Sequence, residues 1–131
     1  MKRLTTTVSC CSLIVAALTL TSWMADDTMI KENGMTVINT TSLGKDVQGF
    51  LGTTPVKIYI QKNKVVKIEA LKNQETPKYF AKVKKNLLDK WNGAKVKDAK
   101  KMKVDAVTGA TYSSKAVIEN VQLGLDYYSK H

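Results

Sequence analysis

The most regular stretch of the sequence reads VKIYIQKNKVVKIEA, from Val56 to Ala70. Apolar side chains alternate with polar ones on both sides of Lys62-Asn63, at Val56, Ile58 and Ile60 before the pair and at Val66, Ile68 and Ala70 after it. A period of two is typical of strands that bury one face, and a short polar connection favours antiparallel pairing. The stretch therefore predicts a hairpin with one face in the core.

The residues before this hairpin give weaker signals. Met35–Asn39 predicts a further short strand, whereas the polar segment 26–34 predicts a loose lead-in. Three glycines between Leu43 and Gly52 indicate turns or a bulge just ahead of the hairpin.

Two helices are predicted after the hairpin. The first opens at Thr76-Pro77, with threonine as N-cap and proline in the first turn, and it ends at Asn92-Gly93. Its core positions follow helical spacing at Phe80, Val83, Leu87, Leu88 and Trp91, and its solvated face carries lysines 78, 82, 84, 85 and 90.

The second helix follows a lysine-rich segment, residues 94–104, whose end at Met102-Lys103-Val104 predicts a short strand. This helix extends to about Ser129, with one face formed by Ser114, Val117, Ile118, Val121, Leu125 and Tyr128. The order of elements predicts an α+β fold, in which two main helices pack on a small antiparallel sheet in a single domain.

The first 25 residues differ in composition from the rest. Lys2 and Arg3 precede an apolar run of 11 residues from Cys10 to Leu20, too short for the ~20 residues that span a bilayer. The pattern is typical of a signal peptide. No good cleavage site follows, so an N-terminal anchor is an alternative. We expect residues 1–25 to be one or the other, residues 26–131 to form the domain, and the protein to be exported to the periplasm or the outer face of the cytoplasmic membrane.

Few residues capable of metal or thiol chemistry lie beyond the leader. Both cysteines, Cys10 and Cys11, fall within it, and the one histidine is the last residue, His131. The sequence after residue 25 therefore excludes disulfides, thiolate metal sites and cysteine-held iron–sulfur clusters. Redox chemistry would need an organic cofactor.

The charge of the sequence is strongly basic. The whole chain carries 21 basic and 11 acidic residues, for a net charge of +10, and Lys2 and Arg3 are the charged residues of the leader. All basic residues beyond Arg3 are lysines. An excess of positive charge favours anionic partners, but base and phosphate recognition in nucleic acids usually employs arginine. With no nucleic-acid motif present, we expect no nucleic-acid partner.

One string at the start of the second helix suggests chemistry. It reads Asp105-Ala106-Val107-Thr108-Gly109-Ala110-Thr111. Gly109 permits a tight turn, and the helix start offers free N–H groups to an anion. A hydroxyl there suits a phosphate ester, and Asp105 would cap the turn or hold a metal ion while the ester forms. An ordinary N-cap before an amphipathic helix is the alternative.

The string resembles the flavinylation motif of the FMN-binding domain family, which includes the C subunit of the sodium-pumping NADH:quinone oxidoreductase and the G subunit of the Rnf complex. The resemblance covers roughly residues 44–129. Two further landmarks are Gly49-Phe50-Leu51-Gly52 with the strand after it, and Gln74-Glu75-Thr76-Pro77, similar to the family's Glu-Thr-Pro-Gly segment beside the flavin. Lys78 stands where the family has that glycine, and the chain is short beside the respiratory subunits.

The resemblance implies FMN attached covalently to Thr111 through a phosphoester by a separate flavin transferase. It implies that Asp105, Thr108, Gly109 and Ala110 form the sequence read by that transferase. Ser113 or Ser114 would bond phosphate or ribityl oxygens, and Glu75 and Thr76 would line the isoalloxazine. The implied function is electron transfer between partner proteins, some of them membrane-bound. A flavin-dependent reductase and a cofactor-free module that binds an anion or a protein are the alternatives.

Overall fold

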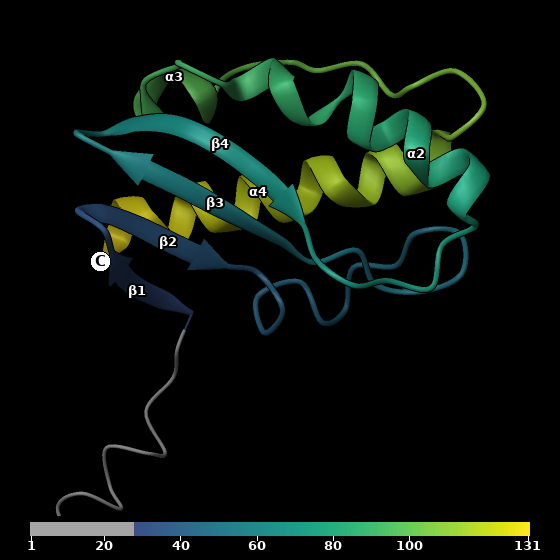
Figure 1. Cartoon of the computed structure of the whole chain (residues 1–131), viewed down its shortest axis with the longest axis horizontal. Coiled ribbons are helices and arrows are strands. Elements are labelled where there is room, and N and C mark those ends of the chain that lie inside the picture. The colour runs from purple at the N-terminus through teal and green to yellow at the C-terminus, as the bar shows by residue number, and fades with distance from the viewer. Residues whose placement is uncertain (1–27) are drawn as a thin grey trace, which may run out of the picture.

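The computed structural model describes residues 28–131, and the predicted leader, residues 1–25, lies outside them. A sheet forms one layer and helices cover one of its faces (Figure 1). The elements in chain order are β1 (Met29–Glu32), β2 (Met35–Asn39), β3 (Val56–Gln61), β4 (Lys64–Ala70), α2 (Pro77–Asn86), the 3₁₀ helix η1 (Leu88–Trp91), α3 (Val96–Ala99) and α4 (Thr111–Lys130). The predicted α+β fold with two main helices, α2 and α4, is confirmed.

The sheet is antiparallel throughout, in the order β1-β2-β3-β4. The prediction of a loose lead-in over residues 26–34 is wrong for β1, which pairs with β2 from Met29↔Ile38 to Glu32↔Met35. The turn between them is Asn33-Gly34, and both residues have positive φ. An Asn-Gly pair of this kind favours a tight hairpin turn, and this local signal outweighs the polar composition of the segment.

The predicted hairpin β3–β4 is present, but the core face of β4 differs from the prediction. The register shifts between Tyr59 and Ile60, so that Ile60 pairs with Val65 and Tyr59 pairs with Lys67. Val66 therefore has no paired residue on β3, and its side chain is 41% exposed, whereas Val65 is fully buried. An extra residue of this kind in one strand reverses which residues face the core beyond it. A prediction that assumes a strict period of two along the strand therefore fails there.

The first predicted helix is present in two pieces, α2 and η1. All five predicted core positions, Phe80, Val83, Leu87, Leu88 and Trp91, are buried. The α-helix ends at Asn86, and Gly93, with a φ of +82°, turns the chain away after η1. The tighter 3₁₀ turn carries Leu88 and Trp91 over β4, so the apolar stripe stays in the core although the helix type changes.

The strand predicted at residues 102–104 is not formed. The outer edge of β4 is occupied instead by the chain at residues 93–95, where Val65 N–H donates to Ala94 O and Gly93 N–H donates to Val65 O. The edge of β4 is therefore not open to residues 102–104. The lysine-rich segment forms the short helix α3, which buries Val96 and Ala99.

The hydrophobic core lies between the sheet and the helices. Its largest fully buried side chains include Trp91, Ile58, Leu87 and Leu125. Residues 28–131 thus enclose a continuous apolar cluster of their own and have the elements of an independently folding unit. Within this part of the chain, no helix is both long enough and apolar enough to span a membrane.

Candidate cofactor site

The acceptor string forms a tight turn that leads into α4. Gly109 has a φ of +86°, a conformation that favours glycine, and Ala110 N–H donates to Val107 O at 3.0 Å. The Ser114 hydroxyl oxygen accepts from Val107 N–H at 3.0 Å and so ties the turn to the helix. Thr111 is the first residue of α4, and its side chain is exposed.

The start of α4 is a favourable place for an anion. The N–H groups of its first turn have no acceptor inside the helix, and the helix dipole is positive at this end. A cation lies close by, because a Cβ placed on Gly109 would lie 3.5 Å from Nζ of Lys82. That ammonium also lies over the ring of Tyr79, 5.9 Å from its centroid. Lys82 belongs to α2, so two helices contribute positive potential to the turn.

A pocket of about 250 Å³ opens beside Thr111. Its walls are Phe50, Thr76, Tyr79, Gly109, Ala110, Thr111, Tyr112 and Ser113. Three of these are aromatic side chains with a large exposed fraction, 64% for Phe50, 67% for Tyr112 and 44% for Tyr79. The rings of Phe50 and Tyr112 are 6.1 Å apart between centroids and tilted by 31°. Such a group of exposed rings next to a hydroxyl suits a planar aromatic ligand that carries an anionic tail.

A buried carboxylate holds the loop that carries Phe50. The Phe50 N–H donates to Oε1 of Glu75 and the Leu51 N–H donates to Oε2, both at 2.6 Å. From the other side, the Ser113 hydroxyl donates to Oε1 at 2.6 Å. Glu75 is 5% exposed. One carboxylate thus joins the loop 49–52 to the first turn of α4, and we call this arrangement the Glu75 clamp.

The ionisation of Glu75 follows from these bonds. Burial by itself would raise the pKa of the Glu75 carboxyl, but hydrogen bonds from Ser113, Leu51, Phe50 and Gly52 outweigh it and lower the pKa below its ordinary value. The carboxylate is therefore charged at neutral pH. A charged acceptor makes stronger hydrogen bonds than a neutral one, which gives the loop a fixed position.

Gly49 is required by the clamp. A Cβ on this residue would collide with Oε1 of Glu75 and would lie 3.2 Å from the carbonyl oxygen of Gly52. The Gly49 N–H also donates to that carbonyl at 2.7 Å. The glycine-rich loop therefore serves to let a backbone approach a carboxylate closely.

The structure brings together most of the residues predicted for the site. Thr76, Gly109, Ala110, Thr111 and Ser113 line the one pocket. Four others do not line the pocket. Glu75 is buried in the clamp, and the Ser114 hydroxyl accepts a hydrogen bond from Val107 N–H. Thr108 and Asp105 are both exposed. The hydroxyls of Ser113 and Ser114 thus both bond to protein groups.

Sequence reasoning missed Phe50, Tyr79, Lys82 and Tyr112 as part of the site. The sequence predicts Lys82 on the solvated face of the first helix, and its side chain is exposed. Tyr79 and Lys82 are three residues apart in α2, a spacing that places them on the same face of the helix. That spacing was the available signal, but the sequence does not reveal that this face turns toward Gly109.

Comparison with known proteins agrees with this geometry. A family model for the FMN-binding domain matches residues 49–126, more than half of the chain. The chain belongs to the FMN-binding domain family. Searches of curated proteins and of solved structures give no significant match.

The matched region of this FMN-binding protein begins at the glycine loop and ends within α4, so it contains both halves of the pocket. Its cofactor is FMN, and the residues present suit that cofactor. The turn and Lys82 offer positive potential to a phosphate, and the three aromatic side chains offer surfaces to a ring system. Within residues 28–131, no three His, Cys, Asp or Glu side chains are grouped so as to hold a metal ion.

Proposed function

We propose that this protein carries FMN as a phosphoester on the hydroxyl of Thr111. The observation that supports this most is the position of that hydroxyl, exposed at the first residue of α4 within the aromatic pocket. The pocket lining holds two other aliphatic hydroxyls, those of Thr76 and Ser113. The Ser113 hydroxyl donates its hydrogen to Glu75, and Thr76 is the N-cap residue of α2 and not part of the first turn of α4.

The residues around Thr111 have distinct roles in this proposal. The free N–H groups at the start of α4 and the ammonium of Lys82 hold the phosphate, because both supply positive potential at the turn. Phe50, Tyr79 and Tyr112 hold the ring system, and the Glu75 clamp keeps Phe50 in place. When bound, FMN supplies the electron-accepting and electron-donating chemistry, and the protein supplies position and electrostatics.

We propose electron transfer between proteins as the function, with attachment by a separate flavin transferase after export. The pocket is small and is bordered by exposed side chains, which leaves the cofactor accessible to a partner protein. A tether suits an exported carrier, because a dissociable cofactor would be lost by dilution. In this proposal the redox partners are proteins that exchange electrons with a flavin, some of them membrane-bound.

The attachment is tested by producing the protein together with a flavin transferase and measuring flavin fluorescence of the denatured protein in a gel. We expect fluorescence in the wild type and none in Thr111→Ala. The matched control is Thr76→Ala, which removes the other threonine hydroxyl of the pocket. The Thr76 side chain forms no capping hydrogen bond to α2, so its loss should leave the helix intact. This control should keep its fluorescence. Loss in Thr76→Ala with retention in Thr111→Ala would move the attachment to residue 76.

The carrier function is tested with the loaded protein. A carrier is reduced and reoxidised by partner proteins, and it turns over small electron acceptors no faster than free FMN does. Turnover of a small acceptor well above the rate of free FMN would replace the carrier with a flavin-dependent reductase. A wild type that takes up no flavin from an active transferase would favour a cofactor-free binding module.

A further inference from the structure

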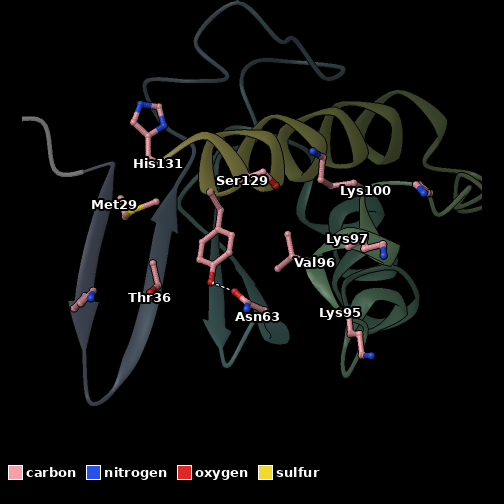
Figure 2. Close-up of a pocket in the computed structure, with 12 residues that line it drawn as sticks. Met29, Thr36, Asn63, Lys95, Val96, Lys97, Lys100, Ser129 and His131 are labelled. Atoms are coloured by element: carbon pink, nitrogen blue, oxygen red, sulfur yellow. Dashed lines mark hydrogen bonds between the residues drawn. The ribbon is translucent and has the colours of Figure 1, made fainter.

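A second and larger hollow lies at the other end of α4. It has a volume of about 980 Å³ and lies between β1 and β2 on one side and α3 on the other. Figure 2 shows Met29 and Thr36 on the strand side, Lys95, Lys97 and Lys100 on the α3 side, and a dashed line from Asn63 to a side chain of α4. That bond is donated by the Tyr128 hydroxyl to Oδ1 of Asn63 at 2.6 Å. We call this hollow the lysine groove.

The lysine groove is strongly positive. Five lysines line it, Lys31, Lys95, Lys97, Lys100 and Lys101. Lys100 forms an ion pair with Asp126 at 3.4 Å, and within residues 28–131 the other four are in no ion pair. Met29 and Val96 provide apolar surface between them. Several like charges around one concave surface repel one another and attract an anionic partner.

The groove is remote from the cofactor site. The two hollows share no lining residue. α4 has 20 residues, so its ends are about 30 Å apart at 1.5 Å per residue. Thr111 is the first residue of α4, and Tyr128 lies two residues before its last. Because electron transfer falls off steeply with distance, a redox centre seated in the groove itself is poorly placed to exchange electrons with a cofactor at Thr111. The groove is suited to holding the protein in place.

The chain enters the domain at this groove. Met29, the first residue of β1, is one of its lining residues, as is Lys31. In the sequence, eight residues separate Met29 from the apolar run that ends at Leu20. If the leader is retained as an anchor, this is therefore the end of the domain nearest the membrane.

We propose that the lysine groove docks on anionic phospholipid headgroups of the membrane surface. Exposed lysines near such a surface are attracted by its negative potential, and the attraction weakens as salt is added. The position of the chain entry and the distance from Thr111 favour a membrane over an acidic electron-transfer protein. If Thr111 carries FMN, as proposed above, this docking turns the cofactor end of α4 away from the membrane.

The test uses the chain from Asp26, which contains the whole described core, without flavin. Its binding is measured by co-sedimentation with phosphatidylcholine vesicles that contain or lack phosphatidylglycerol, at low and at high salt. One variant carries Lys95→Gln, Lys97→Gln and Lys101→Gln. The matched control carries Lys78→Gln, Lys84→Gln and Lys85→Gln, which removes the same charge from α2, a helix that contributes no residue to the groove. All six lysines are exposed, so both variants should fold.

We expect binding to the anionic vesicles only, and release by salt. Each lysine near an anionic surface adds about fivefold to the affinity, so the groove variant should bind roughly 100-fold more weakly and the control less than about fivefold. Equal weakening of the two variants would overturn the proposal, since it would indicate attraction to net charge alone.

Absence of wild-type binding to the anionic vesicles would also overturn it, and binding of polyglutamate at the groove would then favour an acidic protein. Thr111→Ala should bind the vesicles as the wild type does, so failure of this proposal and failure of flavin attachment can be told apart.

Discussion

The two ends of α4 are built on different principles. At its start, the buried Glu75 carboxylate fixes a loop and a helix turn through several short hydrogen bonds. At its end, exposed lysines surround an open groove, and one hydrogen bond, from Tyr128 to Asn63, crosses it. The first arrangement fixes the shape of the pocket, and the second creates a region of positive electrostatic potential. A cofactor site needs atoms in fixed positions, whereas attraction to a charged surface needs only charge in the right region.

The largest expected effect comes from removing the carboxylate of the clamp. Glu75→Ala leaves the N–H groups of Phe50 and Leu51 without their acceptor and frees the loop. We expect the free energy of unfolding to fall by about 3 kcal/mol, measured by urea denaturation. Glu69→Ala is the control, because that carboxylate is exposed and pairs with Lys67 at the surface. Exposed pairs contribute little, so equal losses in the two variants would contradict the role of the clamp.

The clamp should also make stability depend on pH. The pKa of Glu75 is lower in the folded protein than its ordinary value, so its contribution is complete at neutral pH, above the unfolded value of about 4.3. The contribution is lost as the pH falls through the folded pKa. Between pH 7 and about pH 3, the wild type should therefore lose more stability than Glu75→Gln, in urea denaturations at each pH. Parallel losses would show that Glu75 is not the titrating group.

A smaller effect is expected from Gly49. In Gly49→Ala the new methyl group collides with the Glu75 carboxylate, and relief requires the loop to move. We expect a loss of about 2 kcal/mol in thermal or urea unfolding. Gly52→Ala is the matched control in the same loop, since a Cβ there would meet Gln74 at an ordinary 3.9 Å. The reverse order of the two effects would show that the loop is not held as described.

The smallest effect is expected at the end of α4. Tyr128→Phe removes the hydroxyl that bonds Asn63 and leaves the ring in place. A neutral hydrogen bond open to solvent contributes about 0.5 kcal/mol, so urea denaturation should show a loss near that value. A loss as large as that of Glu75→Ala would remove the contrast between the two ends.

The sequence predicted the strong periodic elements and missed those set by local turns or by tertiary contacts. The β3–β4 hairpin and the buried faces of α2 and α4 follow from the spacing of apolar residues, because those residues must share one face to reach the core. The strand β1 rests on a two-residue turn, Asn33-Gly34, in an otherwise polar segment. The exchange of Val65 for Val66 rests on a register shift, which depends on pairing between strands rather than on either strand alone.

The candidate site shows the same division. The motif residues from Gly109 to Thr111 line one pocket together with Thr76 from a distant part of the chain. The roles of Glu75 and Lys82 emerged only from the structure. A carboxylate before Thr76-Pro77 gives no sign in the sequence of which N–H groups it will accept. A lysine on an exposed helix face gives no sign of the turn that will lie against it.

The most direct test of the account is the intact mass of the protein produced with a flavin transferase, followed by fragmentation to locate any adduct. We predict an increase equal to FMN less one water, carried by residue 111 and absent in Thr111→Ala. An unchanged mass, with the transferase active on another substrate, or an adduct on any other residue, would contradict the central claim that Thr111 is the anchor.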